Sequence, residues 1–264
     1  MWLDDQTISL HLPDLSRHTI LLTPASNIPD EPTPCLYSGT MGQDQSSVVA
    51  VTGCKDSPET DVTIASRLVP GGLVDLVIVS GTTYNIKANT SLRRGKDSPA
   101  PAPESDYSVP RQMDADSPMP KQVVIKTHIR YDNTLLGKFE GSHTATKQWL
   151  SRVLEMVRPR LLLSSLDTGV LLQVIGGMEH IDEDIRPDNS TIYRLTINNT
   201  GIGLTSYFGY KLVEYGNYGL SFPNSACKLN GYAVNINLLH TRTQTEVSTA
   251  RVWAHELGHT IGMR

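Results

Sequence analysis

The stretch Trp253-Ala254-His255-Glu256-Leu257-Gly258-His259-Thr260-Ile261-Gly262-Met263-Arg264 is the part of the chain from which the fold can be inferred. On a helix, His255 and His259 stand one turn apart, so both imidazoles project from one face and can share a metal ion. Glu256 lies between them and is placed to act as a general base rather than as a ligand. This His-Glu-x-x-His pattern is typical of zinc hydrolases, and the simpler alternative is two solvated or hydrogen-bonded histidines.

The flanking sequence predicts that this stretch is helical. Apolar residues recur at spacings of three and four, which gives one apolar stripe made of Val247, Ala250, Ala254, Leu257 and Ile261. Thr243 followed by Glu246 predicts a capping box at the start of the helix. Gly262 is predicted to end the helix and to let the chain turn sharply.

The composition excludes several classes of protein. A chain of 264 residues with 39% hydrophobic and 19% charged residues is long enough to bury a core and ordinary for a globular protein. Its formal charge of −4 gives no reason to expect a nucleic acid or an anionic membrane as partner. No stretch approaches the ~20 apolar residues of a membrane span. Residues 1–6 are acidic rather than signal-like, so we expect either a cytosolic chain or a natural start further upstream, and the features below favour the second.

Residues 1–92 are predicted to form a β-rich domain. Strand-like runs at 8–12, 47–52 and 74–79 are bounded by Pro, Gly and Asp. Cys35 and Cys54 flank a predicted hairpin, so they are predicted to form a disulfide in an oxidising compartment, with two buried thiols as the alternative.

Residues 93–120 are rich in Pro, Ser and Asp and are predicted to be a flexible linker, because they carry too few apolar residues to offset the entropy of ordering. The Arg93-Arg94 pair is a candidate for an activating cut, although ordinary linker charges explain it equally well.

From residue 121 the pattern predicts a third region, 121–264, of mixed strands and helices. Residues 123–131 alternate as a half-buried strand, and 143–158 have the apolar stripe of a helix that stops before Pro159. Residues 170–175 are predicted to be an internal strand. Further strands are predicted at 191–197 and 233–239.

The motif His255-Glu256-x-x-His259-x-x-Gly262 resembles the zinc signature of the metzincins, whose third histidine ligand comes three residues after that glycine. The position falls directly after Arg264. Two more segments are similar to adamalysin-type proteins of the ADAM, ADAMTS and venom metalloprotease group. Gly219-Leu-Ser-Phe-Pro-Asn-Ser-Ala-Cys227 resembles the edge strand of their catalytic domains, with Ser221 in place of Ala, and Cys35-x-Tyr-x-Gly with the strand ending at Cys54 resembles their propeptide.

This resemblance implies an α/β (α+β) fold: the upper subdomain of a metzincin catalytic domain, a mixed twisted sheet with helices, preceded by a propeptide-like domain. It implies a secreted zinc metalloendopeptidase with zinc (Zn²⁺) held by His255, His259 and a third histidine, and with Glu256 as the catalytic base. The edge strand would bind a protein or peptide substrate in extended conformation. The chain is then expected to be a fragment that lacks the third ligand, the Met-turn and the disulfide partner of Cys227.

Three further observations bear on this expectation. No cysteine lies between Cys54 and Cys227, so the cysteine-switch ligand common in the family is not visible. The sequons at Asn89, Asn189 and Asn198 fit secretion. The remaining histidines lack ligand spacing and are expected to be structural or solvated: His11, His18, His128, His143, His180 and His240.

Two alternative functions remain open from the sequence. One is a catalytically inactive secreted binding or regulatory module of the same family. The other is a gluzincin, whose downstream ligand is a glutamate, and Gly262 argues against it.

Overall fold

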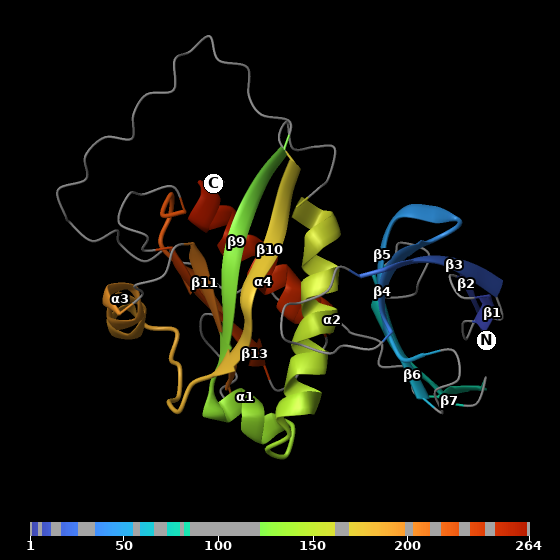
Figure 1. Cartoon of the computed structure of the whole chain (residues 1–264), viewed down its shortest axis with the longest axis horizontal. Coiled ribbons are helices and arrows are strands. Elements are labelled where there is room, and N and C mark those ends of the chain that lie inside the picture. Colours follow the sequence, from blue (N-terminus) through green and yellow to red (C-terminus); the bar gives the residue numbers. More distant parts are fainter. Residues whose placement is uncertain are drawn as a thin grey trace, which may run out of the picture.

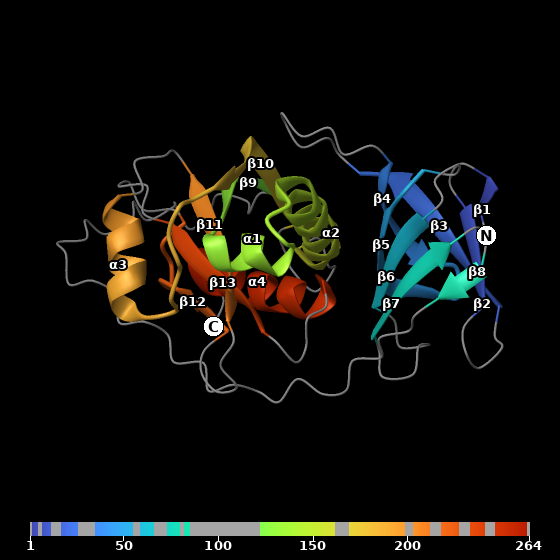
Figure 2. The ribbon, with the colours of Figure 1, turned by 90° about the horizontal axis from the view of Figure 1, so that it is seen from below.

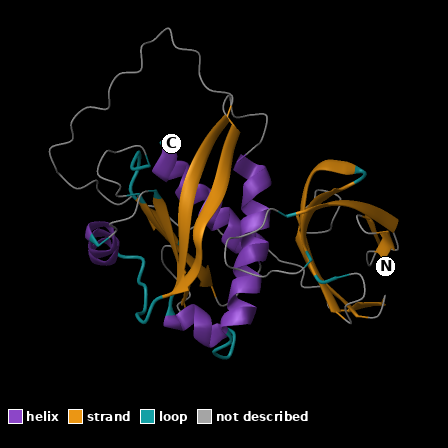
Figure 3. Cartoon of the chain, viewed as in Figure 1, coloured by secondary structure: helices purple, strands orange, loops and turns teal. Residues whose placement is uncertain are grey.

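The computed structural model describes residues 2–4, 7–11, 17–25, 35–54, 59–65, 73–79, 82–84, 122–161, 169–198, 203–211, 218–226, 233–240 and 246–262. Within these ranges the chain forms two β-sheets and four helices (Figure 1, Figure 3). The prediction of a mixed α/β protein is therefore confirmed. The predicted linker at 93–120 lies outside the described ranges, and the division into domains stays a prediction.

The first sheet is an antiparallel meander in which neighbours in the chain are neighbours in space (Figure 2). Its strands are β1 Trp2–Asp4, β2 Thr7–His11, β3 Arg17–Pro24, β4 Leu36–Met41, β5 Asp44–Thr52, β6 Glu59–Ala65, β7 Leu73–Val79 and β8 Thr82–Tyr84. The runs predicted at 47–52 and 74–79 lie in β5 and β7, and the run predicted at 8–12 matches β2 up to His11. The disulfide between Cys35 and Cys54 is present, with Cα atoms 5.0 Å apart, so this prediction is confirmed.

The second sheet has the strand order β10-β9-β11-β13-β12. Its strands are β9 Gln122–Tyr131, β10 Gly169–His180, β11 Leu204–Lys211, β12 Gly219–Ser221 and β13 Val234–His240. The first four strands in this order are parallel, and β12 is antiparallel to β13. Among the described strands, β12 therefore forms one edge of the sheet, as predicted for this segment.

Four helices accompany the second sheet, and they are α1 Asn133–Lys138, α2 His143–Leu161, α3 Asn189–Ile197 and α4 Glu246–Ile261. The helices α2 and α4 share a hydrophobic core with one face of the sheet, where Leu150, Phe208 and Trp253 meet. On the other face, Ile192 and Leu195 of α3 join a separate core. The sheet is thus covered by helices on both faces.

The alternation predicted for the strand at 123–131 is confirmed where the strand crosses the core. Thr127, Ile129 and Tyr131 are buried, whereas Val123 at the start of the strand is 39% exposed. The strand predicted at 233–239 is likewise present as β13.

The prediction of a strand at 191–197 is wrong, because this segment belongs to the helix α3. Its β-branched residues suggested a strand. The side chain of Asp188 caps the helix by accepting the N–H of Thr191 over 2.7 Å, and Ile192 and Leu195 then face the core together. The capping bond and the buried helical face outweigh the strand propensity.

Two further predictions for residues 121–264 differ from the structure. The segment 170–175 was expected to be an internal strand, but β10 pairs only with β9 among the described strands and is an edge. Its buried side chains come from one face packed under α2. Helix α2 continues through Pro159 to Leu161, whose side chain is buried in the core, although a proline cannot donate to the carbonyl four residues earlier.

In the part of the chain that the structure describes, no helix is long and apolar enough to cross a membrane.

Candidate functional site

The helix α4 is fixed to the second sheet by a buried tryptophan. The indole Nε1 of Trp253 donates to Ser206 Oγ on β11 over 2.9 Å, and the ring packs edge-on against Phe208 with centroids 4.9 Å apart. Ala250 and Leu257 are buried beside it, and Ala254 and Ile261 pack against the same core, as the predicted stripe requires. Thr243 and the side chain of Val247 lie outside the described part of the chain.

The two histidines of α4 converge on one point. The Nε2 atoms of His255 and His259 lie 3.0 Å apart, and the rings meet edge-to-face with centroids 4.4 Å apart. His255 is exposed and His259 is half-buried, so their shared side opens to solvent. The structure therefore brings together the two side chains that the sequence proposed as a pair of ligands.

The separation of the two nitrogens suits a shared metal ion. Two nitrogens that ligate one tetrahedral zinc ion at about 2.05 Å lie about 3.3 Å apart. The pair needs to open by only a few tenths of an ångström from 3.0 Å to reach that geometry. Within the described ranges no group of three or more His, Cys, Asp or Glu side chains is placed to hold a metal ion, so zinc stays a prediction.

Glu256 lies on the sheet side of the helix and is 4% exposed. Its Oε2 accepts a hydrogen bond of 2.5 Å from Ser221 Oγ on the edge strand. Its carboxylate also packs on the backbone of Gly219, where an added Cβ would lie only 2.4 Å from Oε1. The third candidate residue is thus held against β12.

The loop after the edge strand caps the end of α4. The N–H of Asn224 donates to the carbonyl of His259 over 2.9 Å, and the N–H of Ala226 donates to that of Thr260 over 3.0 Å. These bonds satisfy carbonyls that a helix end otherwise leaves unpaired. Gly262 follows with φ of +96°, so the predicted turn at this glycine is confirmed.

The sheet beneath Glu256 is polar, which sequence analysis did not anticipate. Asn235 and Asn237 on β13 are fully buried and lie opposite Ser221 and Gly219 in the register. Asn237 Nδ2 donates to Asn235 Oδ1 over 2.7 Å. Burying an amide costs free energy unless the amide is hydrogen-bonded. The available signal was the alternation of asparagine with Val and Ile in this strand.

The importance of Ser221 was also missed from the sequence. The sequence suggested only a small residue in place of the alanine found in the edge strands that this segment resembles. Its hydroxyl is buried and bonded to the carboxylate of Glu256, which no alanine can do. A serine at this position of an edge strand was the only available signal.

A second histidine pair shows no such convergence. The rings of His143 and His180 lie 5.2 Å apart. His143 Nδ1 is 2.8 Å from the hydroxyl of Tyr131, and His180 Nε2 is 2.9 Å from Asn133 Oδ1. Both rings therefore have partners within the fold.

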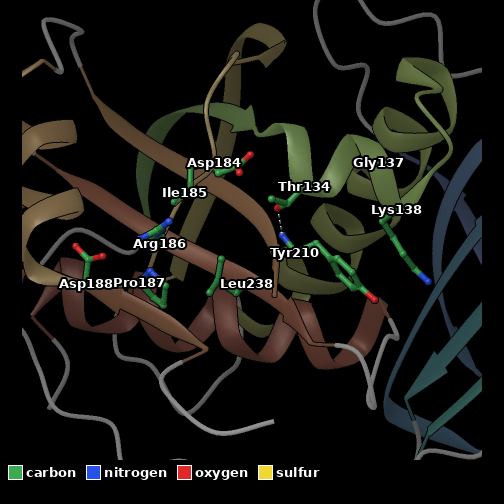
Figure 4. Close-up of a pocket in the computed structure, with 10 residues that line it drawn as sticks. All are labelled: Thr134, Gly137, Lys138, Asp184, Ile185, Arg186, Pro187, Asp188, Tyr210 and Leu238. Carbon is green, nitrogen blue, oxygen red and sulfur yellow. Dashed lines mark hydrogen bonds between the residues drawn. The ribbon is translucent and has the colours of Figure 1, made fainter. Parts of the chain in front are cut away.

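A cavity of about 720 Å³ lies apart from this site, at the carboxyl ends of the parallel strands (Figure 4). Its lining residues come from α1, the segment before α3, β11 and β13: Thr134, Gly137, Lys138, Asp184, Ile185, Arg186, Pro187, Asp188, Tyr210 and Leu238. Beside it, the buried Asp132 accepts hydrogen bonds from the N–H groups of Leu135 and Ile185, and burial raises the pKa of its carboxyl. Its two cationic and two anionic lining residues balance in charge, so it favours neither sign of ligand.

Comparisons with known proteins add little to this geometry. No protein-family model and no curated protein matches the chain. A solved structure described as a chaperone–substrate complex is similar with a TM-score of 0.39 and 10% sequence identity, over 76% of this chain and 27% of that chain. This chain thus spans little more than a quarter of the length of that protein. The likeness establishes neither a common fold nor a common function.

Proposed function

We propose that residues 121–264 are part of the catalytic domain of a secreted zinc metalloendopeptidase of the adamalysin type, preceded by a propeptide-like domain. The observation that carries this proposal is the convergence of His255 Nε2 and His259 Nε2 at 3.0 Å on a helix that also holds Glu256. A zinc ion bound there supplies the Lewis acid for hydrolysis of a peptide bond.

Each candidate residue has its own role in this proposal. His255 and His259 would hold the metal, together with a third histidine of the metzincin pattern. Glu256 accepts the proton of the attacking water and returns it to the leaving amine. Ser221 and Gly219 keep its carboxylate close to the edge strand, since one donates to it and the other leaves room for it.

The edge strand β12 is proposed to bind the substrate. It pairs with β13 on one side, and among the described strands it has no neighbour on the other. An extended peptide can add to such an edge through backbone hydrogen bonds. The carboxylate of Glu256 is in contact with this strand, so a bound peptide would lie next to the general base.

Zinc binding by the chain tests the first part of the proposal. Dialysed protein is measured for zinc content and for the spectrum of bound Co²⁺. His255→Ala and His259→Ala should each lose at least about tenfold in affinity, because a ligand is removed. His180→Ala provides the matched control and should bind as the wild type does. Equal binding by all of these chains would exclude the site.

Catalysis is tested in a chain extended through the third histidine. Glu256→Gln should retain zinc and lose peptidase activity by several orders of magnitude, because the amide accepts no proton. Peptidase activity in the extended wild type would separate the enzyme from the inactive binding module. Zinc binding without any cleavage of a broad peptide library would favour the module.

A further inference from the structure

The strand β5 has two buried faces, and they belong to different cores. Val49 and Val51 point into the core of the first sheet. Val48 and Ala50 belong to the core that contains Leu150 of α2 and the second sheet. Successive residues of a strand point to opposite faces, so Val48 and Ala50 lie on the face of the first sheet opposite to its own core. Helix α2 packs against this outer face at β4 and β5.

The outer face is built from small side chains in one row. Ser38 on β4, Ala50 on β5 and Thr63 on β6 are neighbours in the strand register. Ala50 is 0% exposed and Thr63 is 2% exposed. The water-facing side of an antiparallel sheet is polar and exposed, whereas Ala50 and Thr63 of this row are buried. This row therefore has the character of a surface made to receive a helix.

Polar contacts surround the apolar centre of this interface. Arg152 of α2 donates through Nη1 to Thr52 Oγ1 and through Nε to Glu246 Oε1, each over 2.9 Å. Glu155 of α2 is buried, is paired with Arg158, and is hydrogen-bonded to Ser38. Two of these contacts, Arg152–Glu246 and Glu155–Arg158, join a cation to an anion. The other two are hydrogen bonds to the hydroxyls of Thr52 and Ser38. The first sheet thus fits α2 both in shape and in polarity.

The first sheet meets α4 near its N-terminal end. Glu246, the first residue of α4, shares Arg152 with Thr52. His255 and His259 come nine and thirteen residues later, or about 14 and 20 Å further along a helix. Figures 1 and 2 show the C-terminal end of α4 on the side away from the first sheet, and Figure 2 shows β12 on that side as well.

We propose that the first sheet is a docked partner of α2, that it leaves the His255–His259 pair uncovered, and that the two halves of the chain stay bound when the connection between them is cut. The association is a property of the α2 interface and does not depend on the proposed peptidase function. Cutting the connection would then neither uncover the histidine pair nor release the first sheet.

The experiment uses the whole chain with a recognition sequence for a site-specific protease inserted between residues 93 and 120. The chain is cut without reducing agent and analysed by size-exclusion chromatography and native mass spectrometry at low micromolar concentration. The two fragments should elute together with the mass of the uncut chain. Separate elution of the wild-type fragments would overturn the proposal.

A charge placed on the row of small residues should separate the fragments. Ala50→Glu forces a longer, charged side chain into a fully buried position of this interface, so the dissociation constant should rise by at least about a hundredfold. Leu21→Glu is the matched control, because Leu21 is 54% exposed in the same sheet, and its fragments should stay together. Fragments of Ala50→Glu that bind as tightly as those of the wild type would show that α2 is not the contact surface.

A milder variant covers the case in which Ala50→Glu does not fold. Thr52→Val keeps the shape of the side chain and removes the acceptor for Arg152, so binding between the fragments should weaken about tenfold. Unchanged binding would remove this bond from the interface.

Exposure of the histidine pair is measured separately. Modification of His255 and His259 by diethyl pyrocarbonate, followed by peptide mass spectrometry, should proceed within about twofold at the same rate in the cut complex and in the separated C-terminal fragment, because the first sheet does not cover them. Strong protection in the complex would show that the sheet does cover the pair.

Discussion

Ser221 Oγ donates a hydrogen bond to Glu256 Oε2 over 2.5 Å and so joins the edge strand β12 to the helix that carries the histidine pair. Two residues earlier in the strand, Gly219 leaves the space that the same carboxylate fills. The strand proposed to bind substrate and the residue proposed as general base are therefore one packed unit, and a change in either should be felt by the other.

We predict that Gly219→Ala destabilises the protein by about 1–3 kcal/mol, because overpacking a filled site forces side chains or backbone to shift. The added Cβ would lie 2.4–2.7 Å from three atoms of Glu256. Chemical denaturation measures the change. In Glu256→Ala, which removes those atoms, the same substitution should cost much less, and a cost independent of Glu256 would contradict this account.

Gly137→Ala is the matched control for that substitution. Gly137 lies within α1, and an added Cβ there meets no atom within 4 Å. Alanine should stabilise this helix by up to about 1 kcal/mol through its higher helix propensity.

Glu155 should make the protein less stable as the pH rises. Burial raises the pKa of this carboxyl above its ordinary value of 4.5, despite the pairing with Arg158. The folded state thus holds the proton more tightly than the unfolded chain, so the contribution to stability is full below pH 4.5 and is lost as the pH rises through the folded-state pKa.

The comparison that isolates this residue is with Glu155→Gln. The free energy of unfolding of the wild type, minus that of the variant, should fall as the pH rises from below 4.5 towards neutrality. Other titrating groups, such as Asp132, are present in both proteins and cancel in the difference. A difference that increases over this range would mean that the Arg158 pair outweighs burial.

Loss of the Cys35–Cys54 bridge should cost about 3 kcal/mol, because the bridge restricts the unfolded chain. The two cysteines are 19 residues apart and join the ends of the β4–β5 hairpin. A Cys35→Ala, Cys54→Ala chain should match the reduced wild type in denaturation. A reduced wild type as stable as the oxidised protein would refute the expected contribution.

Limited proteolysis should cut first between residues 93 and 120. That stretch has few apolar residues to hold its backbone in a core. The fragments are identified by intact-mass measurement under non-reducing conditions. First cuts within 123–240 would show that the predicted boundary is misplaced.

Sequence patterns predicted the parts of this fold that depend on near neighbours in the chain. The stripe of Ala250 and Leu257 predicted α4, the glycine at 262 predicted its end, and alternation predicted β9 and β13. The failure at α3 shows the limit of such patterns, because the β-branched residues of 191–197 favour a strand until Asp188 caps the segment and the core takes Ile192 and Leu195 on one face.

What the sequence by itself determined is that His255 and His259 form a pair, since a spacing of four residues places two side chains on one face of a helix. Only the tertiary structure decided what Glu256 touches and what covers α2. Ser221 is 35 residues from Glu256, and Thr52 is 100 residues from Arg152. No local period encodes such contacts, because they depend on how the strands pair and on which face of each sheet the helices cover.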